Sequence, residues 1–371
     1  MKNIVIYEGR EFIKYYSKNK EEIEYCNKIS DIYLTKIYTT DKRVYEDILN
    51  FQNLSKNISI EYVNKSYLKN FLIDISTKHN WIIYISNNKT NMIFDNLINI
   101  PYKFFSDIFE FDNESFTEHA KNKLIYNELS KYYMMSIAND TNKEVSLLQK
   151  IYEKYLNKKE GKILDCCCGV GRHDYILANA GYRVTGIDIS ENQIQTARKI
   201  HNHTNINYYI EDVRNFKLKD KNYDMAICMW TTYNYLSKEQ DLKKFIFNVW
   251  NHLNNGGVLV LDSKNIPILD KKRVYSRKSC KESLEIDLLI FKRVVNNIQN
   301  SKYFYFINDK TKKHFYSDEE FVRFYYLDEI KSIVNGYFDI VDVYGNFDGE
   351  KYDPNKSERF IVVLRKRGNN R

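Results

Sequence analysis

The fold of this chain is decided by the stretch GKILDCCCGVGRHDYILANAGYRVTGID, residues 161–188. Its apolar runs predict a strand over KILDCC, a helix at about 171–180 and a second strand over YRVTGID at 182–188. Between the first strand and the helix, Gly169 and Gly171 allow a tight turn and a close approach of the backbone to a ligand. The first turn of the helix adds unpaired N–H groups. A strand, a glycine turn and a helix in this order predict a site for a polar cofactor.

Two acidic residues extend this site. Asp188 closes the strand after the helix, where a carboxylate can accept hydrogen bonds from both hydroxyls of a ribose. Asp212 closes the next expected strand, and the carboxyl ends of parallel strands meet at one edge of a sheet. A dinucleotide enzyme fits less well, because the G-x-G-x-x-G fingerprint needs glycine where this chain has Asp174, whose charge would repel a pyrophosphate. A cofactor with a positive sulfonium and no phosphate removes that conflict.

The order of the elements predicts two parts. Residues 1–115 alternate apolar runs with helical stretches, which predicts a small, separate α/β domain, and a polar linker is expected at 116–126. From 127 to 371, strands joined by helices indicate a doubly wound, Rossmann-like sheet covered on both faces, with an antiparallel β insertion at 266–316. The strands expected in the first domain are 3–7, 31–35, 58–63 and 81–86, and those in the insertion are 272–276, 283–295, 302–309 and 312–316.

The carboxy-terminal end is expected to complete the sheet. A helix is predicted at 317–336, because Ser317 and Glu320 have the spacing of a capping box and Gly336 ends the run. Two last strands follow, at 337–344 and 358–365. A long helical stretch at 127–156, interrupted near Asn139 and Asp140, precedes the sheet.

From about residue 125 onward, the chain resembles the class I S-adenosylmethionine-dependent methyltransferases. ILDCCCGVGRHDYILANAGYRVTGIDIS is similar to the glycine motif and acidic loop of that family, and an ending with Ser357 and Arg359 just before the last strand is similar to one of its branches. The resemblance implies S-adenosyl-L-methionine as cofactor, S-adenosyl-L-homocysteine as product and methyl transfer to an N or O nucleophile. Its later landmarks follow in order as EDVRNF (211–216), YDMAICMWTTYNYL (223–236) and LNNGGVLVLDSKN (253–265).

The resemblance also implies which residues hold the cofactor. Asp165 would lie near the methionine amino group, Asp188 would bind the ribose hydroxyls and Ile189 would pack on adenine. Tyr133 would cover the cofactor and Met229 would lie beside its methionine part, although both could equally be core residues. The other positions implied are Cys167, Gly169, Gly171, Asp212 and Val213.

Three adjacent cysteines occupy the glycine turn. Neighbouring residues at a strand end point to opposite faces, so Cys166, Cys167 and Cys168 are not expected to converge on a metal ion. Cys166 and Cys168 are expected to be small buried side chains. Cys167 stands where the family has its first glycine, and its Cβ predicts an ordinary φ and a cofactor carboxylate held slightly further out.

The acceptor is expected over the ends of the fourth and fifth strands, beneath the insertion. Methyl transfer depends mainly on positioning, with a base only where a proton must leave. Tyr235 is the candidate acid, base or orienting group, and the alternative is a packed aromatic in a chain with 32 tyrosines. His173 is expected to be structural and His314 is a weaker candidate base. The pocket is expected near Trp230, Tyr233, Asn234, Tyr235 and Lys264.

Three hypotheses for the partner remain open. Residues 1–115 are loosely similar to the RNA-substrate-binding domain of SpoU-type methyltransferases, which implies an RNA acceptor. Against RNA, this domain carries a charge of −1, with 15 basic and 16 acidic residues. The carboxy-terminal ending favours a small molecule instead, such as an amino sugar or another amine or hydroxyl. A cofactor-binding protein without catalysis is the third hypothesis.

The composition indicates the charge and the cellular compartment of the protein. The chain of 371 residues has a net charge of +8, with +5 in residues 266–371, which suits an anionic partner or a solvated lysine-rich surface. Its six cysteines lack a framework-like spacing, and its start does not resemble a secretory segment. No run approaches the roughly 20 apolar residues needed to cross a bilayer. We therefore expect a cytoplasmic protein with no membrane segment and no metal.

Overall fold

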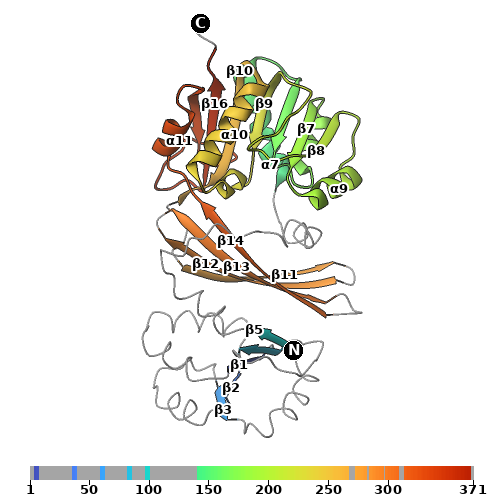
Figure 1. Cartoon of the computed structure of the whole chain (residues 1–371), viewed down its shortest axis with the longest axis vertical. Helices are drawn as coiled ribbons and strands as arrows, with labels where there is room; N and C mark the ends of the chain where they lie inside the picture. The colour runs from blue at the N-terminus through green and yellow to red at the C-terminus, as the bar shows by residue number, and fades with distance from the viewer. Residues whose placement is uncertain are drawn as a thin grey trace. The chain divides into compact units, whose positions relative to one another are not determined.

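The structure is a computed structural model of the chain, and it divides into two compact units (Figure 1). The first comprises residues 1–119, 273–291 and 302–317, and the second comprises the remaining residues. The residues described are five strands within 1–100, then 140–266, 272–281, 284–295, 297–308 and 313–368.

The first unit contains a five-stranded parallel sheet in the order β3-β2-β1-β4-β5. Strands are confirmed where the sequence predicts them near 3–7, 58–63 and 81–86. The second strand lies directly after the predicted 31–35, which itself is outside the described residues, and the last strand was not predicted. The bounds are β1 Ile4–Tyr7, β2 Lys36–Thr39, β3 Ser59–Tyr62, β4 Ile82–Ile85 and β5 Leu97–Ile100.

A seven-stranded sheet forms the centre of the second unit, in the order β15-β16-β10-β9-β6-β7-β8. β16 runs antiparallel to both of its neighbours, whereas β10, β9, β6, β7 and β8 are parallel. This is the Rossmann-like arrangement that the sequence predicts. The bounds are β6 Lys162–Cys166, β7 Arg183–Asp188, β8 Ile206–Ile210, β9 Tyr223–Cys228, β10 Leu253–Lys264, β15 Phe338–Tyr344 and β16 Arg359–Lys366.

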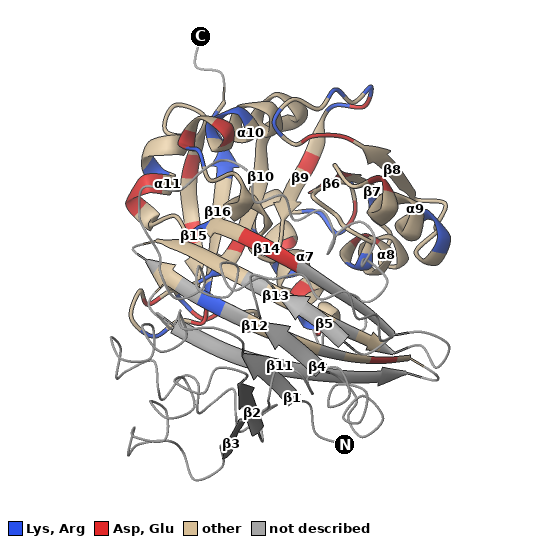
Figure 2. Ribbon diagram, turned by 60° about the horizontal axis from the view of Figure 1, so that its bottom comes forward, with Lys and Arg blue, Asp and Glu red and all other residues tan. Residues whose placement is uncertain are grey.

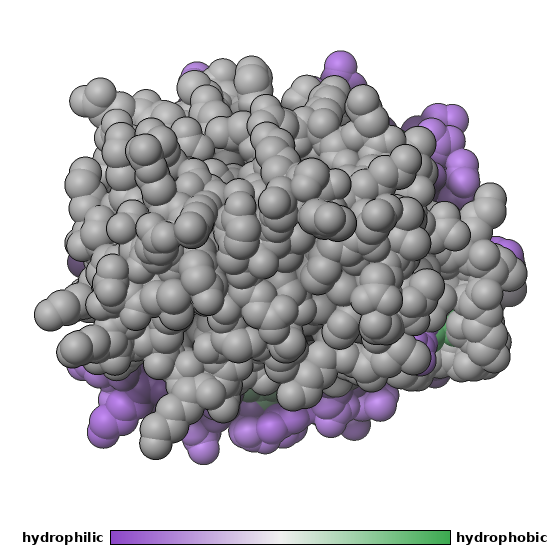
Figure 3. Space-filling view, turned by 90° about the horizontal axis from the view of Figure 1, so that it is seen from below, coloured by the Kyte–Doolittle hydropathy of each residue, from purple (hydrophilic) through white to green (hydrophobic). Residues whose placement is uncertain are grey.

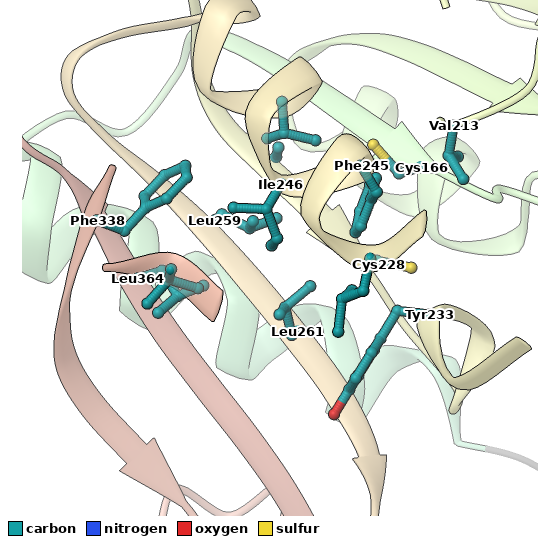
Figure 4. Packing of buried hydrophobic residues seen from close by; sticks show 14 of the residues in the cluster. Cys166, Val213, Cys228, Tyr233, Phe245, Ile246, Leu259, Leu261, Phe338 and Leu364 are labelled. Carbon is teal, nitrogen blue, oxygen red and sulfur yellow. The ribbon is translucent and has the colours of Figure 1, made fainter. Parts of the chain in front are cut away.

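Helices cover both faces of this sheet, because its strands are apolar on both sides. Along β10, Leu259 and Leu261 pack with α10 and α11, whereas Val258 and Val260 pack with α7, α8 and α9. Figure 4 shows the first of these clusters, with Phe245 of α10 among the side chains of the sheet. The helices are α7 Thr141–Leu156, α8 Arg172–Asn179, α9 Glu191–Ile200, α10 Glu239–His252 and α11 Leu327–Val334, with a 3-10 turn, η3, at Thr232–Tyr235.

A four-stranded sheet in the order β11-β12-β13-β14 occupies the predicted insertion, with residues in both units. The helix predicted from Ser317 is wrong in its first half, because residues up to Arg323 belong to β14 and the next three residues are not helical. Asp318, Glu320 and Val322 are buried while the residues between them are only half-buried, which is the period of a strand. The helix begins at Leu327 instead. The strands are β11 Lys272–Lys281, β12 Leu284–Val295, β13 Ile298–Asn308 and β14 Lys313–Arg323.

The described surface is polar. Figure 2 shows acidic and basic residues interspersed along α10 and α11, and the described residues visible in Figure 3 are mostly hydrophilic. Within the part of the chain that the structure describes, no helix is long and apolar enough to cross a membrane. The side chains of the basic stretch 270–281, which the RNA hypothesis would use to contact phosphates, lie outside the described residues, so this contact stays a prediction.

Candidate cofactor site

The glycine turn wraps tightly over the end of β6. The N–H groups of Cys167 and Cys168 both donate to the carbonyl oxygen of Ile187, at 2.7 and 3.0 Å. Two successive N–H groups reach one carbonyl because Cys167 has a φ of 67°, in the left-handed region. The expectation of an ordinary φ at this position is therefore wrong: cysteine replaces the glycine but keeps a backbone conformation that favours glycine.

Gly171 is required by a neighbouring side chain. It has a φ of 77° and forms the N-cap of α8. A Cβ at this position would lie 2.1 Å from Oη of Tyr208, so any side chain would displace that ring. The turn therefore presents backbone rather than side chains at the start of α8.

The strain at Cys167 yields a first prediction. Cys167→Gly removes the left-handed strain, whereas Cys167→Ala loses the same thiol but keeps the Cβ. We expect the glycine variant to be more stable than the alanine variant by about 1 kcal/mol, as measured by urea unfolding. Cofactor binding should stay at the wild-type level or improve in Cys167→Gly. An alanine variant as stable as the glycine variant would contradict the strain argument.

Asp188 is held by the turn. Its Oδ2 accepts the N–H of Gly169 at 3.0 Å, and its Oδ1 accepts the N–H of Ser190 at 2.8 Å. Burial raises the pKa of this carboxyl, and these backbone donors partly offset that effect. Directly after it, the side chain of Ile189 is 67% exposed. A fixed acceptor beside an exposed apolar side chain fits a ribose and an adenine ring.

Asp212, two residues after the end of β8, is the second acidic residue of the candidate site. Its carboxylate accepts the Arg214 backbone N–H at 2.9 Å and pairs with the Arg214 guanidinium. Although burial alone would raise its pKa, the contacts with Arg214 hold the pKa of Asp212 below its ordinary value. Val213, between them, is buried. Asp212 is therefore ionised and fixed in position.

Cys166 and Cys168 are buried side chains, as the sequence predicts. Cys166 packs in the core on the α10 side of the sheet and Cys168 in the core on the α7 side. Burial raises the pKa of both thiols well above the ordinary value, so they remain protonated at neutral pH. Cys167 is half-buried against Cys228. The contact with the Cys228 thiol and burial both raise the pKa of the Cys167 thiol. Among the described residues, no group of three His, Cys, Asp or Glu side chains could hold a metal ion.

Trp230 links three elements beside the turn. Its Nε1 donates to Oε2 of Glu144 on α7 at 2.7 Å. The same oxygen lies 2.6 Å from Nε2 of His173 and 3.6 Å from the guanidinium of Arg172. These contacts give His173 a buried structural partner, as expected. Met229, directly after β9, packs in the core with 5% exposure, which favours the core interpretation.

A buried ion pair holds the other side of Trp230. Nε of Arg359 donates to Oδ1 of Asp262 at 2.9 Å, and the guanidinium of Arg359 lies 4.9 Å from the centre of the Trp230 ring. Asp262 is fully buried, and its Oδ2 also accepts the N–H of Trp230 at 2.8 Å. Trp230 and Thr231 both have left-handed φ values, 62° and 67°. The ion pair therefore holds a strained turn at the end of β9.

Four of the five predicted acceptor residues lie on this turn and on η3, and Lys264 ends β10. The Tyr235 hydroxyl hydrogen-bonds to Oε1 of Glu320 on β14, and the side-chain amide of Asn234 donates to the Arg323 carbonyl at 2.6 Å. Tyr233 is buried and donates to Ser263 at 3.2 Å. The Lys264 backbone N–H donates to Thr231 Oγ1 at 3.2 Å. Tyr133 and the side chain of His314 lie outside the described residues.

Several residues of the site were not predicted. Asp262 follows the apolar run of β10, two residues before that strand ends, so the position of an acidic residue after a buried run could have identified it. Glu144 and Glu320 had no such signal, because each reaches the site from an element distant in sequence. The pairing of Asp165 with Asp174 was also not predicted, although the sequence had singled out both positions.

Comparisons with known proteins agree with this geometry. A family model described as a methyltransferase domain matches residues 163–257, about a quarter of the chain. The malonyl-[acyl-carrier protein] O-methyltransferase of Bacillus anthracis is 31% identical over 120 residues, which cover 32% of this chain and 43% of that protein. The chain thus spans less than half the length of the curated relatives that it matches.

Two solved structures share the fold over nearly their whole length. One is an S-adenosylmethionine-dependent methyltransferase of Clostridium acetobutylicum, with a TM-score of 0.57, 18% identity and coverage of 65% of this chain and 98% of that chain. The other is the sugar N-methyltransferase KedS8 of Streptoalloteichus, with a TM-score of 0.58, 16% identity and coverage of 70% and 99%. The second unit therefore has the Rossmann-like fold of these methyltransferase structures, and residues 163–257 match a methyltransferase domain.

Proposed function

We propose that the protein transfers a methyl group from S-adenosyl-L-methionine to a nitrogen or oxygen of a small molecule. The observation that carries this proposal is the Asp188 carboxylate, fixed by two backbone N–H groups beside the exposed Ile189. That pair matches a ribose and an adenine without a phosphate-binding group. The match of residues 163–257 to a methyltransferase domain supports the same cofactor.

The residues of the chain mainly bind and orient in this reaction. When bound, the cofactor supplies an electrophilic methyl group on its sulfonium. Asp188 would fix the ribose, Ile189 would pack on adenine, and the Asp212 carboxylate with the Val213 N–H would face the adenine edge. Tyr235 would orient the acceptor, and its oxygen would accept the proton that leaves the acceptor while its own hydroxyl proton passes to the Glu320 carboxylate.

A small acceptor is favoured over RNA by two observations. Glu320, which contacts Tyr235, belongs to β14 of the four-stranded sheet, so this sheet supplies a polar group beside η3, after the end of β9. KedS8, a sugar N-methyltransferase, shares the fold over 99% of its length, and the Bacillus anthracis relative is an O-methyltransferase of a carrier-bound malonyl group. The RNA hypothesis depends mainly on the side chains of residues 1–115, which are not among those that the structure describes. It therefore stays a prediction.

Tyr235→Phe gives a prediction for the transfer step. We expect kcat to fall by about 10²-fold or more, because the hydroxyl moves the proton in the transition state, with little change in cofactor affinity. Glu320→Gln should lower kcat in the same direction but less, since the hydroxyl remains. Tyr175→Phe, on the exposed side of α8, is the matched control and should keep wild-type kcat. Equal kcat in Tyr235→Phe and the control would leave Tyr235 a packed aromatic.

The acceptor itself is found by a methylation screen. The full-length protein is incubated with S-adenosylmethionine labelled on its methyl group, against total RNA in one arm and against fractionated amines and hydroxylated metabolites in the other. Label in a small-molecule fraction supports the proposal, and label in RNA replaces it with the RNA hypothesis. Cofactor binding with no transfer in any fraction would favour a cofactor-binding protein without catalysis.

A further inference from the structure

Two carboxyl groups without ordinary partners lie under the glycine turn. Asp165, at the end of β6, is 1% exposed, and Asp174, in the first turn of α8, is fully buried. Among the described residues, no N–H or O–H donor reaches Oδ2 of Asp165 or either carboxylate oxygen of Asp174. Buried carboxylates ordinarily have such donors, so both groups require an explanation.

Asp165 and Asp174 both lie beside Gly186 of β7. Asp165 is paired with Gly186 of β7, and the carboxyl of Asp174 lies against that glycine. A Cβ at Gly186 would be 2.6 Å from Oδ2 of Asp174. The absence of a side chain at Gly186 therefore makes room for the Asp174 carboxyl, and this carboxyl raises the pKa of Asp165.

We propose that Asp165 and Asp174 share one proton, and that the resulting singly charged pair binds the ammonium group at the methionine end of the cofactor. This inference rests on the proposed function and names a recognition group within it. Asp165 would contact the ammonium, and Asp174 would act through Asp165 as a positioning residue. Two ionised carboxylates buried next to each other would repel each other. One shared proton instead gives the pair the single negative charge that an ammonium needs.

The surrounding groups support a shared proton. Asp188, Cys168 and Tyr208 face the pair from the neighbouring elements, and none of them is a cation. His173, on α8 itself, contacts Glu144. Burial raises the pKa of Asp174 to about 7 and that of Asp165 well above its ordinary value, which the carboxyl of Asp174 raises further.

The proposal fixes how binding depends on pH. Below about pH 7 the pair holds two protons and must release one to solvent before an ammonium binds. At about pH 6 only about one molecule in ten holds the singly charged pair, so affinity should be about tenfold weaker than at about pH 8. Calorimetry in two buffers of different ionisation enthalpy should show close to one proton released at the lower pH and almost none at the higher.

The test uses the full-length protein and S-adenosylhomocysteine, which keeps its ammonium over this range and cannot react. In Asp174→Asn, the amide takes the place of the shared proton and donates to Asp165. This variant should bind as tightly as wild type at about pH 8 and lose less than about twofold at about pH 6. Asp220→Asn, at an exposed loop position, should keep the wild-type pH dependence. 5′-Methylthioadenosine has no ammonium and should bind wild type without proton release.

Thermal unfolding gives a second readout. A carboxyl whose pKa is raised in the folded state contributes stability below about pH 4 and loses it as the pH rises through about 7. Asp174→Asn should therefore gain thermal midpoint relative to wild type as the pH rises, by several degrees at about pH 8.

The outcomes separate this inference from the proposed function. Wild-type binding of S-adenosylhomocysteine without proton release at about pH 6 would overturn the shared proton alone. The same pH dependence in Asp174→Asn as in wild type, or a loss of tenfold or more at about pH 8, would also overturn it. If wild type bound neither S-adenosylhomocysteine nor S-adenosylmethionine, the proposed function would fail together with the inference. The wild-type proton count decides the question even if Asp174→Asn does not fold.

Discussion

Asp188→Ala is expected to weaken binding of S-adenosylmethionine by at least about 100-fold, or about 3 kcal/mol. The carboxylate would accept hydrogen bonds from the ribose hydroxyls, and bonds to an ionised acceptor contribute about 1.5–3 kcal/mol each. It also accepts the N–H groups of Gly169 and Ser190, so its loss removes the anchor of the glycine turn. Both effects act on the cofactor and leave the acceptor residues in place.

Isothermal titration calorimetry with the full-length protein measures this effect. Asp188→Asn should lie between wild type and alanine, because its amide retains one acceptor oxygen but turns an NH₂ group towards one of the two backbone donors. Asp220→Ala is the matched control and should bind like wild type, since its side chain is 69% exposed. A dissociation constant for Asp188→Ala within threefold of wild type would mean that the ribose is held elsewhere.

The fold of the second unit could be predicted because each strand of the parallel sheet is a short apolar run. Apolar runs such as YDMAIC at 223–228 are buried on both faces, and helices of suitable length connect them. Alternation alone would place Cys166 and Cys168 on the same face, but the left-handed turn at Cys167 lies between them, and they pack in opposite layers of the core. Asp188 was found by the same logic, since its position at a strand end follows from local spacing.

Properties set by tertiary contacts could not be predicted in this way. The left-handed φ of Cys167 follows from two N–H groups that reach one carbonyl on the next strand. Likewise, the capping-box spacing of Ser317 and Glu320 is local, but pairing within the four-stranded sheet overrides it and places Glu320 against Tyr235. The sequence thus located the residues of the candidate site more readily than their contacts.

The acceptor side of the site depends on a buried ion pair, and this dependence determines what its removal would do. Asp262 accepts the N–H of Trp230, and Trp230 and Thr231 both have left-handed backbone conformations. Strained residues of this kind persist only where neighbouring contacts fix them. If Arg359 is lost, Asp262 becomes an uncompensated buried charge directly under the turn that leads to Tyr235.

Arg359→Met is therefore expected to lower the free energy of unfolding by about 3–5 kcal/mol. Methionine fills part of the space but leaves the Asp262 carboxylate without its cation. Arg359→Lys should lose less, because the charge remains while the paired geometry does not. Urea unfolding measures the loss, and kcat of the folded fraction should fall as the turn at Trp230 relaxes.

A surface pair provides the matched control for this substitution. Arg367 contacts Asp339 at 2.7 Å, but both side chains are about half exposed, so Arg367→Met should cost less than about 1 kcal/mol. Combining Arg359→Met with Asp262→Asn removes the uncompensated charge, so the double variant should be more stable than Arg359→Met alone. If both arginine variants lost equal stability, burial of the pair would not be what stabilises the turn. If the double variant were instead the least stable, the Asp262 carboxylate would hold the turn through the Trp230 N–H without needing Arg359.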